Sequence, residues 1–251
     1  MSSPDEPAAL TAEPTTEPPP ERAAGVHPDP HRTYFTVVPL AFIAAVLVMT
    51  IVSVAAAPQG DNLLIQLGRL ADDSTFYQWS FVVAAALPVL ALLLTGGVGL
   101  FLVARGEQAH TGAGWLGFIG AFFVGAYAPL SAVAYVSQFT ILPKQLGKNF
   151  QAAETWYFGY EGSIPLTIDL LAYALFGIGG ILISVGLVRR AGSLRWAGWS
   201  LAACGVASVL AFVLHVLDSG ATGTVSVVSG ALTIPFALGV FLDAQRDEVD
   251  R

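Results

Sequence analysis

Charged side chains are scarce in this sequence. They make up 12% of its 251 residues, about half of the roughly 25% that is usual in soluble domains. Hydrophobic residues make up 55%, more than the core of a soluble domain of this size needs. The net charge of -7 lies mostly in the two ends of the chain, so the rest offers no basic surface for nucleic acid. The composition therefore excludes an ordinary soluble domain and a nucleic-acid-binding protein.

Recognisable catalytic motifs are also missing. The sequence contains no His-Glu-x-x-His, no Gly-x-Ser-x-Gly, no phosphate-binding loop and no Cys-x-x-Cys, so metalloprotease, hydrolase, nucleotide-driven and thiol-redox chemistry lack their residues. The single cysteine, Cys204, cannot form an intrachain disulfide. Outside the N-terminal tail only His110 and His215 remain, and the topology derived below places them on opposite sides of a membrane. We therefore expect no metal, no haem and no other cofactor.

Long uncharged runs are abundant. Six of them, each long enough to cross a hydrocarbon core about 30 Å thick, are Thr33 to Gly60, Ser74 to Ala104, Gly112 to Pro143, Leu170 to Val188, Trp196 to Leu214 and Ser219 to Leu242. Backbone polar groups in lipid must be satisfied internally, and these runs lack the alternation of a membrane β-barrel. The sequence therefore predicts an all-α polytopic bundle embedded in a lipid bilayer. The predicted spans are about 34-57, 76-104, 113-140, 164-188, 196-217 and 222-242.

The distribution of Lys and Arg predicts the orientation of these spans. If the N-terminus is cytoplasmic, the cytoplasmic segments contain Arg22, Arg32, Arg105, Arg189, Arg190, Arg195, Arg246 and Arg251. The external segments then contain only Arg69, Lys144 and Lys148. Under the positive-inside rule this asymmetry predicts an N-in, C-in protein of the plasma (inner) membrane, with both termini cytoplasmic.

The ends of the chain differ from the membrane domain, predicted over 34-243. Residues 1-33 hold eight of the fifteen prolines together with Ala, Glu, Thr and Ser, a composition that predicts a disordered cytoplasmic tail. Residues 244-251 form a second, short cytoplasmic tail. Prolines at positions 88, 129 and 235 fall in mid-span, where each removes a helix hydrogen bond and permits a kink.

Two external segments are long. Residues 61-75 carry apolar residues at helical spacing, which is typical of a helix lying at the membrane interface. Residues 141-163 contain Trp156, Tyr157, Phe158 and Tyr160, whose rings favour the depth of the lipid headgroups. We consider two interpretations: the rings are membrane anchors, or the two segments are lids over a site.

Small residues at a spacing of four predict where helices pack closely. They are Gly117, Ala121 and Gly125 in the third span, Gly180 and Ser184 in the fourth, and Ser226 and Gly230 in the sixth.

Polar side chains near the external ends of three consecutive spans form the candidate site. An ionisable group inside a membrane is costly unless it is paired or hydrated, so each is a functional candidate. The candidates are Tyr135 and Gln138 in the third span, Asp169 and Tyr173 in the fourth, and His215 and Asp218 at the end of the fifth. If their faces converge, they form an outward-facing pocket in which Asp169 supplies the charge and His215 with Asp218 relays protons. The alternative is that they mark the membrane boundary or stabilise helix packing.

Three classes of function fit these features. First comes an accessory, sensory or structural membrane protein, whose partner is another membrane protein or a second copy of the chain. A small proton- or solute-coupled transporter is second. A membrane enzyme acting at headgroup depth ranks last, because His215 and Asp218 are its only candidate acid-base pair.

Overall fold

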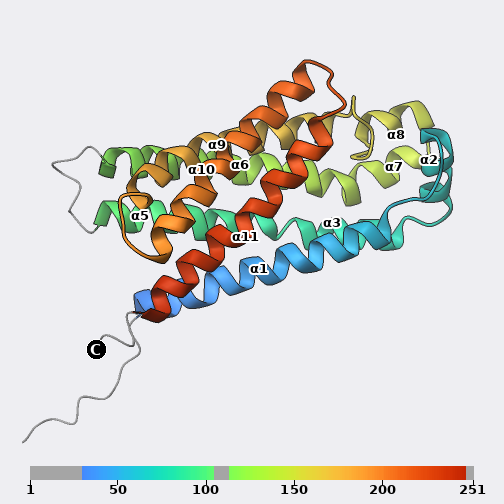
Figure 1. Ribbon diagram of the computed structural model, residues 1–251. Coiled ribbons are helices and arrows are strands. Elements are labelled where there is room, and N and C mark those ends of the chain that lie inside the picture. The colour runs from blue at the N-terminus through green and yellow to red at the C-terminus, as the bar shows by residue number, and fades with distance from the viewer. Residues whose placement is uncertain (1–29, 105–112, 247–251) are drawn as a thin grey trace, which may run out of the picture.

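The computed structural model describes residues 30-104 and 113-246, and all regular secondary structure within them is helical (Figure 1). Six helical segments are long and apolar enough to span a membrane: Pro30–Ala56, Thr75–Ala104, Gly114–Leu146, Ile164–Leu187, Ser193–Val216 and Thr222–Arg246. The predicted all-helical class, with six helices long and apolar enough to cross a membrane, is thus confirmed. The two predicted tails lie mainly outside the described residues.

Helix α9 (Ile164–Leu187) is the centre of the bundle, where it packs between α6 (Ala113–Thr140) and α10 (Ser193–Val216). In its most apolar stretch 61% of the residues are buried, against 11% in the peripheral helix α1 (Pro30–Ala56). Helix α11 (Thr222–Arg246) covers α10 and joins it to α1.

The bundle has two different ends. We call the end with the α9-α10 connection, residues 188-192, the turn end. There α1 and α11 meet, because Gln245 Nε2 donates to Thr36 Oγ1 over 3.1 Å, and from there they diverge toward the opposite end (Figure 1). Both described termini therefore lie at the turn end, as an even number of spans requires.

The second span is irregular, although Ala85 and Ala86 within it keep right-handed helical backbone angles. Helix α3 (Thr75–Ala84) ends before α4 (Leu87–Ala91), which carries Pro88 in its first turn. A π-helical turn, Leu92–Gly96, follows before α5 (Gly97–Ala104). By contrast, Pro129 and Pro235 are accommodated inside α6 and α11 without ending either helix.

Three short helices form a small cap over the ends of α3 and α6: α2 (Leu63–Asp72), α7 (Leu142–Leu146) and α8 (Phe150–Trp156). We call this end of the bundle the cap end. The cap has an apolar core of its own, made of Leu67, Leu70, Tyr77, Leu142, Leu146, Ala153 and Tyr157. The amphipathic residues expected to lie at the membrane interface thus form a helix whose Leu67 and Leu70 pack inside protein.

The aromatic segment after α8 is not a simple row of anchors. Tyr157 is buried in the cap, and its hydroxyl donates to Gln66 Oε1 over 3.0 Å. Burial also raises the pKa of Tyr157 to about 12. The Phe158 ring packs on Phe81 and Tyr135, whereas Tyr160 is exposed. The two external segments therefore hold one another, with Phe158 directed into the bundle.

Candidate functional site

Asp169 is the charged group buried in the interface between α6 and α9. It lies about one turn inside α9 from the cap end and is 5% exposed. Ser131 donates to Asp169 Oδ1 over 2.6 Å, and the Tyr135 hydroxyl lies 3.4 Å from Oδ2. The Tyr173 hydroxyl, one turn further along α9, lies 3.4 Å from that of Tyr135. Tyr135, Asp169 and Tyr173, three of the predicted site residues, are thus brought together.

Sequence reasoning missed two members of this group, Ser131 and Tyr127. Tyr127, Ser131 and Tyr135 recur at a spacing of four, which places them on one face of α6. The Tyr127 ring lies 5.7 Å from the Tyr173 ring, measured between centroids. The stripe itself was the available signal, since one polar residue per turn is unusual in so apolar a helix.

Every hydrogen-bond partner of Asp169 among the described residues is a hydroxyl group. The titratable groups that face this cluster are Tyr127 and Tyr135 on α6, Tyr173 on α9 and Cys204 on α10, and none is basic. An unpaired carboxylate in such surroundings is costly, because the hydroxyls replace only part of its hydration. The arrangement therefore suits a proton or a small hard cation, which oxygen ligands prefer.

Gln138 lies outside the Asp169 group. Its side chain is fully buried, and its Oε1 accepts from the Tyr77 hydroxyl and from the Phe158 backbone N–H, both over 3.0 Å. Its Nε2 donates to the Trp156 carbonyl oxygen and to Ser137 Oγ, both over 2.9 Å. Gln138 therefore joins α6 to α3 and to the end of α8, and its polar groups are engaged in holding the cap.

His215 and Asp218 lie at the far end of α10, where neither contacts the other through its side chain in the hydrogen bonds described. His215 Nε2 lies 3.0 Å from Thr167 Oγ1. The Thr167 hydroxyl also lies 3.0 Å from the Ser163 carbonyl oxygen, so this contact joins His215 to the first turn of α9. Asp218 is exposed in the turn after α10, with a φ of 54°.

Close helix contacts lie further along α9, two to three turns from Asp169. A Cβ on Gly179 would approach the Gly120 carbonyl oxygen to 2.6 Å, and a Cβ on Gly177 would approach that of Gly205 to 2.5 Å. Gly125 and Gly230, two of the glycines expected to pack closely, have no atom within 4 Å of such a Cβ. The tightest contacts of α9 therefore use Gly177 and Gly179, outside the predicted spacing.

Within residues 30-104 and 113-246, no group of three or more His, Cys, Asp or Glu side chains could hold a metal ion. No family model, curated protein or solved structure matches this chain.

Proposed function

We propose that this chain is an accessory or sensory integral membrane protein, and that the hydroxyl-lined Asp169 group is its sensing element for a proton or a small monovalent cation. One observation carries the proposal: Asp169 is buried between two central helices with hydroxyl partners alone. A bound proton or cation supplies the missing positive charge. Its arrival changes the hydrogen bonds that link α6 to α9, and a partner in the membrane responds to that change.

A response at Asp169 can reach the cap through Tyr135. The Tyr135 hydroxyl lies beside the carboxylate, and its ring packs on Phe158, with 5.9 Å between centroids. The Phe158 backbone N–H is in turn held by Gln138. We therefore expect the response to appear in the cap residues.

The test is hydrogen-deuterium exchange of full-length protein in nanodiscs, measured over a series of pH values and, separately, of sodium concentrations. We expect exchange in residues 141-163 to change along at least one series in the wild type and along neither in Asp169→Asn. Asp218→Asn is the matched control, since Asp218 is an exposed acid near the same end and Asn tolerates its positive φ. If Asp169→Asn responds as the wild type does, Asp169 is a packing residue and the sensing proposal fails.

A proton- or solute-coupled carrier is the second candidate, favoured by the irregular second span. Discontinuous helices line the binding sites of many secondary transporters, and in this span α3 gives way to α4 at Ala85 and Ala86, with a π-helical turn after α4. Proton or solute flux into proteoliposomes that Asp169→Asn abolishes would favour the carrier over the sensor. An enzyme is the least supported class, because His215 is paired with Thr167 and Asp218 is exposed.

The proposal places the cap outside the cell and the turn end in the cytoplasm of a plasma (inner) membrane. At the turn end Arg189 and Arg190 follow α9, Arg195 lies in the first turn of α10, and Arg246 ends α11, as the positive-inside rule requires. The native Cys204 is fully buried, so the wild type serves as an unlabelled control for maleimide labelling. A membrane-impermeant maleimide applied to intact cells should label Asp61→Cys and spare Ala191→Cys; the reverse pattern contradicts the orientation.

A further inference from the structure

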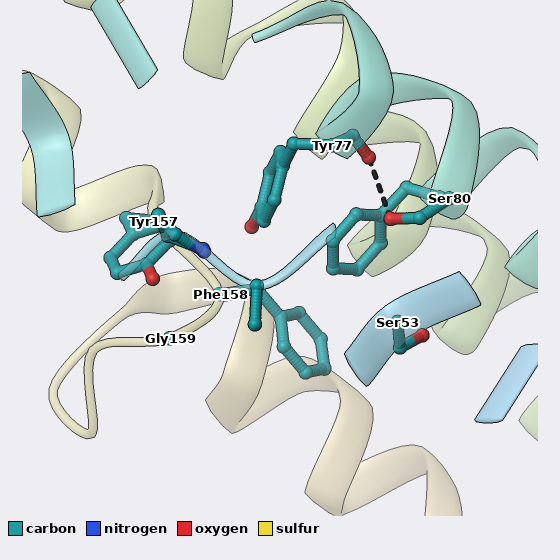
Figure 2. A pocket seen from close by; sticks show the side chains of 9 residues that line it. Ser53, Tyr77, Ser80, Tyr157, Phe158 and Gly159 are labelled. Carbon is teal, nitrogen blue, oxygen red and sulfur yellow. Dashed lines mark hydrogen bonds between the residues drawn. The ribbon is translucent and has the colours of Figure 1, made fainter. Parts of the chain in front are cut away.

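A cavity of about 160 Å³ lies at the cap end, between the end of α1, α3 and the segment that follows α8. Figure 2 shows Ser53, Tyr77, Tyr157 and Phe158 around it. The complete lining is Ser53, Ala57, Pro58, Tyr77, Ser80, Phe81, Tyr157, Phe158 and Gly159. None of these residues belongs to the Asp169 group, so the cavity is a separate feature.

The cavity presents aromatic carbon rather than polar atoms. The hydroxyls of Tyr77, Tyr157 and Ser80 all donate to other groups, namely Gln138 Oε1, Gln66 Oε1 and the Tyr77 carbonyl oxygen. Their donor protons are therefore used within the protein, and the rings form most of the walls. Aromatic walls favour a flat apolar ring, which stacks on them or meets them edge to face.

The shape of the cavity is fixed by the backbone beside it. Phe158 N–H is held by Gln138, and a Cβ on Gly159 would approach the Tyr157 ring to 2.5 Å. The residues that follow α8 are thus packed against their own side chains, which holds this wall of the cavity in place. Its size is close to that of an engineered cavity of about 150 Å³ that binds benzene.

Ser53 gives the cavity one polar point. Its hydroxyl has no hydrogen-bond partner among the residues that the structure describes. Ser53 lies near the end of α1, flanked by Ile51 and Val54, whose side chains are 69% and 71% exposed. An amphiphile dissolved in the membrane can therefore reach the cavity along α1 without crossing water.

We infer that this cavity binds the ring of a neutral membrane-soluble amphiphile, of phenol or quinone type, with its ring oxygen hydrogen-bonded to Ser53. The back wall of the site, formed by Phe81 and Phe158, packs directly on the ring of Tyr135. A bound ring therefore contacts Phe81 and Phe158, which pack on Tyr135 beside Asp169. The site does not depend on the proposed role of Asp169, which makes no contact with the lining residues in the hydrogen bonds described.

The test uses 4-(trifluoromethyl)phenol as the probe and full-length protein in nanodiscs, with binding followed by fluorine NMR. We expect saturable binding to the wild type, at least about tenfold weaker in Ala57→Trp, which fills the cavity from its rim. Val54→Trp, on the lipid-facing side of α1, is the matched control and should bind as the wild type does. Ser53→Ala should weaken binding about fivefold, as the loss of one hydrogen bond predicts.

Two outcomes overturn the inference. Binding that never saturates, or that is equal in the wild type and Ala57→Trp, shows partition into lipid alone. Displacement of the probe by 1-decanol at lower concentration than by unlabelled 4-butylphenol shows that the occupant is an alkyl chain. Asp169→Asn should bind the probe normally, so a failure of the sensing proposal and a failure of this one give different results.

Discussion

The two ends of the bundle are held together by different forces. Toward the turn end α6 and α9 touch through backbone, at Gly120 with Gly179. Toward the cap end they are spaced by hydroxyls, amides and rings, as around Asp169 and Gln138. Both arrangements are stable in a bilayer, where van der Waals packing and hydrogen bonds replace the hydrophobic effect between helices. The comparison indicates a rigid base at the turn end and a more adjustable cap end, where the cavity lies.

The largest effect should follow from breaking the backbone contact. Gly179→Ala places a Cβ 2.6 Å from the Gly120 carbonyl oxygen and 2.8 Å from Val124 Cγ2, so the helices must separate. We expect a loss of about 3 kcal/mol of stability, at the upper end for overpacking, measured by unfolding in detergent micelles. Gly125→Ala, which meets nothing within 4 Å, should be neutral or stabilising by up to about 1 kcal/mol. Equal losses of stability in the two variants would show that the backbone contact does not make the turn end rigid.

The next effect should be confined to the cap. Gln138→Leu leaves the Tyr77 hydroxyl, the Phe158 N–H and the Trp156 carbonyl oxygen without their partner. We expect a cost of about 2 kcal/mol, since each buried polar group left unsatisfied is expensive. Hydrogen exchange should rise in residues 141-163 and stay unchanged in α9 and α10. Gln151→Leu, at an exposed position of α8, is the control, and a rise spread evenly over all helices would contradict a separate cap.

A smaller effect should depend on pH. Burial raises the pKa of Tyr157 from its ordinary value of 10.0 to about 12, so the folded state retains the phenol proton more firmly than the unfolded state. The contribution of this proton to stability is complete below pH 10 and is lost as the pH rises toward 12. Tyr157→Phe should cost about 1 kcal/mol at neutral pH through the lost hydrogen bond to Gln66. It should also flatten the decline in cap stability between these pH values, whereas Tyr160→Phe should not.

The smallest effect should come from one hydroxyl of the Asp169 group. Ser131→Ala removes the 2.6 Å hydrogen bond to Asp169 Oδ1, and we expect a loss of about 0.6 kcal/mol, the average for hydrogen bonds between membrane helices. Ser226→Ala, whose hydroxyl bonds only within its own helix, should lose less. If Ser131→Ala exceeds Gly179→Ala in cost, the rigid and adjustable ends have been assigned the wrong way round.

Hydropathy predicted the six long apolar helices well, because a helix that can cross a bilayer needs a minimum apolar length wherever it lies in the bundle. It could not rank α9 above α1 in burial, since both are apolar over most of their length and lipid is as apolar as a protein core. What distinguishes α9 is its small and polar residues, Gly177, Gly179 and Asp169 among them. Which glycines touch depends on the crossing angle and register of two helices, and sequence spacing alone does not determine these.

The candidate site was predicted in part for a similar reason. Asp169 and Tyr173 are one turn apart in one helix, so their shared face follows from helical geometry. The partnership with Tyr135 required only that α6 pack on α9. His215 and Gln138 were placed at a similar depth, but depth does not determine direction around a helix axis. Gln138 turns to the cap, whose position the sequence left open, and His215 turns to Thr167 of the predicted fourth span.

The glycine contact between α6 and α9 has a mechanical consequence. Asp169 lies ten residues along α9 from Gly179, about 15 Å at 1.5 Å per residue, so a tilt of about 3° about the contact moves it by roughly 0.8 Å. The Tyr135 hydroxyl lies 3.4 Å from Asp169 Oδ2, and a displacement of that size brings the two to the roughly 2.7 Å of a short, strong hydrogen bond. Because α9 can pivot on its backbone contact with Gly120, a rotation of a few degrees is enough to make or break the hydrogen bond between Tyr135 and Asp169.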